Sequence, residues 1–218
     1  MPVIKETYQQ IHEELRLSKI TLVAVSKMKP VEDILELYEL GHRDFGENYV
    51  QELVEKAAQL PNDIRWHFIG HLQTNKVKQV VPFVYLIHGI DSWKILKEID
   101  KQAEKNSRVI DCLLQVHIAQ EETKFGLDEN ELNEFDINQY ANVKVKGLMG
   151  MASLTDNVNT IRSEFKHLKV IYDKLSTLNP QLSILSMGMS SDYKIAIEEG
   201  SNMVRIGSLV FGERNYGK

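Results

Sequence analysis

The chain has 218 residues, with 26 lysines and arginines against 31 aspartates and glutamates, and a formal net charge of −5. Hydrophobic residues make up 43%, enough for a substantial core, and we expect a single barrel domain over residues 1–218. One cysteine, Cys112, excludes an internal disulfide framework and favours a reducing, cytoplasmic location. The acidic charge balance argues against a nucleic-acid-binding surface. No apolar run reaches the roughly 18 residues of a membrane span, and the charged N-terminus argues against a signal peptide.

Short apolar runs alternate with longer segments of helical periodicity along the chain. Residues 5–17 have a helical pattern, and residues 21–25 (TLVAV) are a continuous apolar run, typical of a parallel strand buried on both faces. Residues 31–40 repeat apolar side chains at the helical period, and Gly41 follows where a C-cap glycine is expected. We expect further strands at residues 44–45, 65–69, 84–88, 110–117, 143–148, 182–186 and 203–206, and further helices at 47–59, 76–81, 92–105, 129–139, 160–178 and 192–199.

Eight strands that alternate with helices predict a parallel sheet with right-handed crossovers. Such a sheet either closes into a (β/α)8 TIM-type barrel or stays open and doubly wound. Eight units in about 200 residues suit a compact barrel. No G-x-G-x-x-G follows the first strand, which disfavours an open dinucleotide-binding sheet. We therefore expect an α/β fold with a closed barrel.

Lys27 is the first candidate for chemistry, because active sites of such barrels lie at the carboxyl ends of the strands. It follows the first strand and shares the side-chain parity of Val23 and Val25, which directs it towards the barrel mouth. In apolar surroundings the pKa of an amine falls, and the neutral amine can attack an aldehyde to form a Schiff base. The alternative is a surface lysine that begins a loop, because Lys29 and Pro30 follow at once.

Two loops near the C-terminus have the composition of a phosphate site. Ser190 and Ser191 stand before a predicted helix as N-cap residues, where free N–H groups favour an anion. Gly207 and Ser208 follow the last strand, and barrels often bind phosphate between the loops after strands seven and eight. Capping and a tight turn explain each loop singly, whereas the pair favours a phosphate cradle. Together with Lys27, this cradle indicates a phosphorylated aldehyde ligand.

Other polar side chains at strand ends are less specific. Arg205 stays charged, so if it points inward it can hydrogen-bond a ring nitrogen without protonating it; the alternative is an outer salt bridge. Asn48 either reaches the barrel mouth or caps the next helix. His67 and His71 have no carboxylate or cysteine at ligand spacing, so we expect no metal site. Four methionines are expected in the core or lining a pocket: Met149, Met151, Met187 and Met189.

Six motifs occur in the order seen in the pyridoxal phosphate homeostasis proteins: AVSK (24–27), FGEN (45–48), WHFIG (66–70), GLM (147–149), SMGMS (186–190) and VRIG (204–207). The chain resembles this family from about residue 5 to Arg214. The resemblance implies a fold type III barrel, similar to the N-terminal domain of alanine racemase, that binds pyridoxal 5'-phosphate (PLP) without established turnover. It also implies a role for each matching residue: Lys27 as the Schiff-base lysine, Arg205 as the partner of the pyridine nitrogen, Ser190, Gly207 and Ser208 as phosphate ligands, and Asn48 and Met149 as further cofactor contacts.

One residue departs from the family pattern. His71 stands where the family commonly has proline, which puts the rigidity of the loop after the third strand in doubt.

Three functions are compatible with these residues. The first is a cytoplasmic, monomeric PLP homeostasis protein that stores or carries the cofactor, with free amino acids and PLP-dependent apo-enzymes as partners. The second is a PLP-dependent amino-acid racemase. Racemases with this barrel take a second base from an added β domain, and the chain ends at Lys218 directly after the eighth unit, so we expect no such activity. The third is an aldolase-type barrel using Lys27 on a sugar phosphate, which would lack the PLP absorption band.

Overall fold

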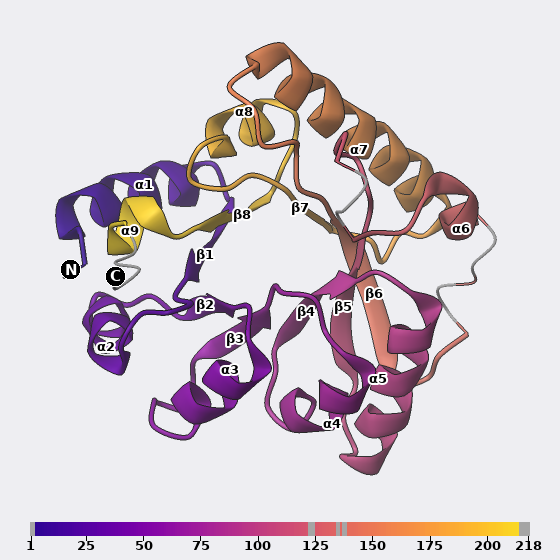
Figure 1. Ribbon diagram of the computed structural model, residues 1–218, viewed down its shortest axis with the longest axis horizontal. Coiled ribbons are helices and arrows are strands. Elements are labelled where there is room, and N and C mark those ends of the chain that lie inside the picture. Colours follow the sequence, from indigo (N-terminus) through magenta and orange to yellow (C-terminus); the bar gives the residue numbers. More distant parts are fainter. Residues whose placement is uncertain (1–2, 122–124, 134–135, 137–138, 214–218) are drawn as a thin grey trace.

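A closed barrel of eight parallel strands forms the centre of the molecule, and helices surround it (Figure 1). The computed structural model describes residues 3–121, 125–133, 136 and 139–213. The strands follow one another around the barrel in chain order, and β8 pairs with β1. The expected (β/α)8 TIM-type barrel is therefore confirmed. The strands are β1 (Thr21–Val25), β2 (Asp44–Glu47), β3 (Arg65–Phe68), β4 (Leu86–Ile90), β5 (Ile110–Gln115), β6 (Val143–Met149), β7 (Ile184–Ser186) and β8 (Met203–Ile206).

The helices cover the outside of the barrel, as its parallel crossovers require. A short helix after β8 was not predicted; it lies beside the first helix, and the Ile4 N–H donates to the Val210 carbonyl at 2.8 Å (Figure 1). The helical elements are α1 (Lys5–Leu17), α2 (Val31–Glu39), α3 (Val50–Ala57), the 3-10 turn η1 (Thr74–Lys76), α4 (Val77–Val80), α5 (Trp93–Lys105), α6 (Glu129–Asn133), α7 (Val158–Leu178), α8 (Tyr193–Glu198) and α9 (Ser208–Phe211).

Strand parity divides the core into two layers. The outer layer lies between barrel and helices and takes alternate strand residues such as Leu22, Phe45 and Phe68. The other parity fills the barrel with a small inner cluster: Val23, Leu86, Leu113, Met149 and Met203. The inner layer leaves room for polar side chains at both ends of the barrel, which is where the two cavities described below lie.

Most element boundaries differ from the prediction by only a few residues. The helix expected at 47–59 is shorter, because Glu47 pairs with Phe68 as the last residue of β2. The strand expected at 84–88 is Leu86–Ile90. Part of the helix expected at 129–139 lies outside the described residues. Within the described part of the chain, no helix combines the length and the apolar character needed to cross a membrane.

Candidate cofactor site

A cavity of about 730 Å³ opens at the carboxyl ends of the strands. The loops after β1, β2, β7 and β8 contribute to its wall, as expected for this fold. Six of the seven predicted site residues line it: Lys27, Asn48, Ser190, Arg205, Gly207 and Ser208. The structure therefore brings together residues that are up to 181 positions apart in the sequence.

Lys27 is half-buried at the cavity wall and follows a firmly anchored residue. The hydroxyl of the buried Ser26 donates to Glu47 Oε1 at 2.6 Å. Lys56 Nζ donates both to the Ser26 carbonyl at 2.7 Å and to Glu47 Oε1 at 2.7 Å. These contacts fix the backbone immediately before Lys27. The parity argument did place Lys27 towards the mouth, but nothing in the sequence pointed to the Glu47–Lys56 pair beneath it.

Glu47 is fully buried, and its Oε2 has no hydrogen-bond partner among the described residues. Burial raises the pKa of Glu47 to about 7, against the opposing effects of Lys56 and Ser26. On the other side of Lys27, the Met28 N–H donates to Glu52 Oε1 at 2.6 Å, and Glu52 also pairs with Lys56. Lys27 is thus held between two anchored backbone positions.

The loops after β7 and β8 contact each other directly. The Gly207 N–H donates to Ser190 Oγ at 3.2 Å, so the two expected halves of a phosphate cradle meet. The prediction that Ser190 and Ser191 cap the following helix is wrong. The N-cap of α8 is Asp192, whose carboxylate accepts the Met189 N–H at 2.6 Å. Ser190 is therefore available at the cavity wall, and it lies next to Gly207, the N-cap residue of α9.

Arg205 closes the floor of the cavity with only 3% of its surface exposed. Its Nη1 donates to the carbonyl and to the hydroxyl of Ser186, at 2.9 and 2.7 Å, and its Nη2 donates to the Gly150 carbonyl at 3.0 Å. The alternative of an outer salt bridge is wrong, because the side chain points inward. Burial lowers the pKa of Arg205 to about 10, so the guanidinium remains charged at neutral pH.

Asn48 reaches the cavity and does not cap α3, whose N-cap residue is Tyr49. Its Oδ1 is buried and has no hydrogen-bond partner among the residues that the structure describes. Met149 is the predicted site residue that the structure does not bring to the cavity. It is fully buried in the inner cluster, and Met151 and Met189 line the cavity instead.

The two histidines considered for metal binding lie in different surroundings. His67 is buried inside the barrel, whereas His71 is exposed. His71 Nδ1 lies 2.6 Å from Asp91 Oδ2, and the ring stacks on Phe125 at 4.0 Å, so contacts restrain the loop where proline is absent. In the part of the chain that is described, no three His, Cys, Asp or Glu side chains form a group that could hold a metal ion.

The chain matches the family model described as alanine racemase, N-terminal domain, over residues 3–215. The pyridoxal phosphate homeostasis protein of Aquifex aeolicus is 45% identical over 199 residues, covering 89% of this chain and 87% of that protein. The chain belongs to the pyridoxal phosphate homeostasis protein family. The family member of Escherichia coli is 36% identical over 206 residues, covering 92% of this chain and 88% of that protein.

Solved structures share this architecture. PipY of Synechococcus elongatus without PLP superimposes with a TM-score of 0.90 at 35% identity, covering 96% of this chain and all of that chain. PipY with PLP bound gives a TM-score of 0.86 at 34% identity, covering 95% of this chain and 99% of that chain. Alanine racemase from Bartonella henselae shares the fold at 18% identity, with a TM-score of 0.66, and covers 93% of this chain and 56% of its own.

Proposed function

We propose that this chain binds PLP in the cavity at the barrel mouth and serves the homeostasis of this cofactor. One observation carries the proposal: a half-buried lysine, a paired Ser190–Gly207 loop contact and the inward-pointing Arg205 line the same cavity. Membership of the family and the PLP bound by PipY support it.

The side chains in the cavity fit the functional groups of PLP. The cofactor has an aldehyde, a phosphate, a ring hydroxyl and a pyridine nitrogen. The cavity offers an amine at Lys27, hydroxyls at Ser190 and Ser208, and guanidinium N–H groups at Arg205. It also offers the buried Oδ1 of Asn48, which has no partner among the described residues. Its volume of about 730 Å³ lies within the usual range for small-molecule sites.

When bound, PLP supplies an aldehyde that condenses with amines. We propose Lys27 as the amine that holds it as a Schiff base. Gly207 allows the backbone after β8 to approach a phosphate, and Ser190 and Ser208 donate hydroxyl hydrogens. These residues bind and orient the cofactor.

Arg205 favours storage of PLP over PLP-dependent catalysis. PLP enzymes that stabilise a carbanion use the protonated pyridine ring as an electron sink, which a carboxylate partner favours. A guanidinium can only donate, and its pKa of about 10 keeps it charged at neutral pH. We therefore propose that the protein is a PLP carrier or store, not an enzyme.

We extend the proposal to the whole chain. Residues 1–218 act as one PLP-binding barrel domain, monomeric and cytoplasmic. PLP is the principal partner, and free amino acids and PLP-dependent apo-enzymes take the cofactor from it.

The test is the absorption spectrum of the PLP-loaded protein before and after borohydride reduction, with the modified lysine mapped by mass spectrometry. We expect a reducible band and a pyridoxyl group on Lys27, both lost in Lys27→Ala. Lys105→Ala, an exposed lysine on α5, is the matched control and should retain both. A reduced label on another lysine refutes the assignment of Lys27; Lys124, which lies outside the described residues, would be examined first. No band in the unmodified protein refutes PLP binding.

A further inference from the structure

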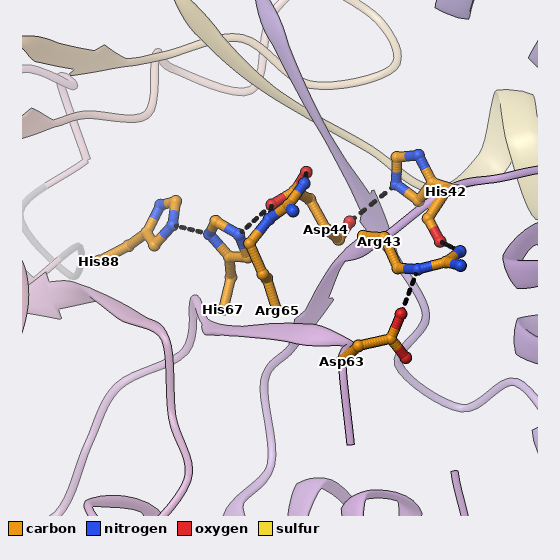
Figure 2. A network of polar contacts seen from close by, with 7 residues as sticks. All are labelled: His42, Arg43, Asp44, Asp63, Arg65, His67 and His88. Carbon is orange, nitrogen blue, oxygen red and sulfur yellow. Dashed lines mark hydrogen bonds and ion pairs between the residues drawn. The ribbon is translucent and has the colours of Figure 1, made fainter. Parts of the chain in front are cut away.

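A line of buried polar side chains crosses the interior of the barrel beneath the cavity. Arg205 Nη1 lies 2.7 Å from Ser186 Oγ, and Ser186 Oγ lies 3.3 Å from His88 Nδ1. His88 Nε2 lies 2.9 Å from His67 Nδ1, and His67 Nε2 lies 3.1 Å from Asp44 Oδ1 (Figure 2). We call these five residues the barrel chain. They come from β8, β7, β4, β3 and β2, and the middle three are completely buried.

Such a line is unusual for a barrel of this type, whose interior is dominated by Val, Ile and Leu. Burying polar groups is costly unless each one is hydrogen-bonded, so a continuous chain of partners is required once the first polar residue is present. The inner cluster of Val23, Leu86 and Met149 shows that this barrel can also hold apolar side chains. The barrel chain therefore needs an explanation beyond packing.

With both imidazole rings neutral, the donors and acceptors allow only one consistent direction along the barrel chain. An ionised carboxylate only accepts, so the Nε2–H of His67 donates to Asp44. The bare Nδ1 of neutral His67 then accepts from the Nε2–H of His88. The bare Nδ1 of His88 in turn accepts the hydroxyl hydrogen of Ser186. The lone pairs of Ser186 Oγ are left for the N–H of Arg205, so every bond points away from the cavity.

The far end of the barrel chain fixes this direction. Asp44 pairs with Arg65, and Figure 2 shows the two side chains together beside His67. Burial opposes ionisation, but the hydrogen bonds from Arg65 and His67 hold the pKa of Asp44 well below its usual range. A second cavity, of about 470 Å³, reaches Asp44, Arg65 and His67 from the opposite end of the barrel. Burial in the barrel interior lowers the pKa of His88, which keeps this ring neutral.

At the cavity end, the barrel chain orients the guanidinium. Arg205 has five N–H groups, of which two donate to Ser186 and one to Gly150. The Nε–H and one Nη2–H remain without a partner among the described residues. Ser186 and Gly150 hold the other three N–H groups. Because the guanidinium is planar, its two remaining N–H groups then point in a fixed direction.

We propose that His88 is a positioning residue: acting through Ser186, it holds the Arg205 guanidinium so that its remaining N–H groups meet the pyridine nitrogen of PLP. Asp44 sets the direction of the chain through His67. The inference rests on the proposed PLP binding, but the tautomers of the two histidines can be tested without PLP.

The first measurement is ¹⁵N NMR of protein labelled at histidine, without PLP. We expect His67 and His88 to be neutral Nε2–H tautomers. In Asp44→Leu, His67 can donate from Nδ1 instead, so both tautomers should change. Arg65→Met is the matched control, because it removes the partner of Asp44 but leaves the carboxylate to accept, and both tautomers should persist. An Nδ1–H tautomer at His88 in the unmodified protein overturns the proposal, whether or not PLP binds.

The second measurement uses PLP labelled with ¹⁵N at the ring nitrogen. In the unmodified protein its resonance should not move between about pH 6 and 9, because the nitrogen accepts from a guanidinium that stays charged. In His88→Leu the resonance should titrate with pH, and the Kd should rise about tenfold for PLP and for pyridoxal alike. His88→Gln, which retains one donor and one acceptor, should restore the pH-independent resonance.

His42→Leu controls for the loss of a buried histidine. His42 is 4% exposed and its ring hydrogen-bonds the main-chain carbonyl of Asp44, at 2.8 Å, not a side chain of the barrel chain, so the ring-nitrogen resonance of PLP should stay unchanged. If His88→Leu does not fold, Asp44→Leu carries the same test, because it reverses the donors and acceptors of the barrel chain from the Asp44 end. A pH-independent resonance in PLP-loaded His88→Leu or Asp44→Leu refutes the positioning role, whereas failure of the unmodified protein to bind PLP refutes the proposed function.

Discussion

Replacing Ser190 with alanine should weaken the binding of PLP much more than the binding of pyridoxal, which lacks the phosphate. In the structure the Ser190 hydroxyl accepts the Gly207 N–H at 3.2 Å, and both residues line the cavity. The substitution removes a hydroxyl donor from the proposed phosphate cradle. It leaves the amine at Lys27 and the guanidinium at Arg205 unchanged, so the ring and aldehyde contacts persist.

The size of the effect follows from the charge of the phosphate. A hydrogen bond to a charged group contributes about 1.5–3 kcal/mol, and about 1.4 kcal/mol corresponds to a tenfold change in Kd. We therefore expect the Kd for PLP to rise roughly 10- to 100-fold in Ser190→Ala. For Gly207→Val, the added Cβ alone would lie 3.3 Å from the Val25 carbonyl oxygen and 3.4 Å from Val25 Cβ. The two further methyl groups of valine would then obstruct the approach of the backbone to the phosphate. A variant that combines Ser190→Ala with Gly207→Val should therefore lose PLP almost completely.

Titration calorimetry with PLP and with pyridoxal measures both affinities on the same protein. Ser176→Ala is the matched control, because Ser176 is a half-buried serine on α7, away from the cavity, whose hydroxyl donates to the Asp173 carbonyl of the same helix. It should leave both affinities unchanged. Equal losses for PLP and pyridoxal in Ser190→Ala would show that these loops do not form a phosphate cradle.

Three further predictions concern stability and turnover. Because burial raises the folded-state pKa of Glu47 from 4.5 to about 7, the unfolded chain binds fewer protons, and this group makes stability fall as pH rises through that interval. Lys56→Met removes the cation that pairs with Glu47. Urea unfolding should show the free energy of unfolding reduced by about 3 kcal/mol at pH 8, where Glu47 is ionised, and by less at pH 5, where it is protonated. An equal reduction at both pH values contradicts the pairing. Gly147 has φ +158°, and the Cβ added in Gly147→Ala would lie 1.7 Å from the Ile184 carbonyl oxygen of β7, so the free energy of unfolding should fall by about 3 kcal/mol or more. Gly41 has φ +91° but open space around it, so Gly41→Ala should lower the free energy of unfolding by only about 1 kcal/mol. Chiral chromatography should detect no racemisation of alanine or serine by the PLP-loaded protein above a free-PLP control, and racemisation abolished by Lys27→Ala would establish an enzyme instead.

Local periodicity predicted the barrel well, because apolar runs such as TLVAV of β1 alternate with segments that repeat apolar side chains at the helical period. The exceptions are elements decided by contacts distant in sequence. Glu47 reads as the start of a helix, but it extends β2 because it pairs with Phe68 of β3. The helix α9 has only four residues and packs against α1, at the other end of the chain, so its own periodicity is too short to detect.

The site was predictable where strand parity and loop composition determine it. Lys27 reaches the cavity because its parity directs it inward, and Ser190 and Gly207 because barrel loops seven and eight adjoin. The sequence leaves the direction of Arg205 open, and contacts with Ser186 and Gly150 hold it inward. Met149 has the inward parity as well, but it lies deeper, in the inner cluster.

The barrel chain could not be predicted in the same way. His67 and His88 are 21 positions apart, and His88 and Ser186 are 98 positions apart, so no sequence spacing indicates that they meet. His67 was considered only as a metal ligand, because an isolated histidine on a strand does not reveal its partners. Once the barrel closes, the register of β2, β3 and β4 brings these side chains into one interior line.

Two buried networks therefore support the two groups proposed to hold opposite sides of the PLP ring. Glu47 and Lys56 anchor the backbone before Lys27 from outside the barrel wall, and the barrel chain anchors Arg205 from within it. The pairing of β1 with β8 connects the two, since Val23 lies opposite Arg205 in the register. A rigid planar ligand held at two points tolerates little displacement of either, and a preorganised site loses less conformational freedom on binding. Affinity should therefore fall when either network is broken, even though Glu47, Lys56 and His88 do not line the cavity.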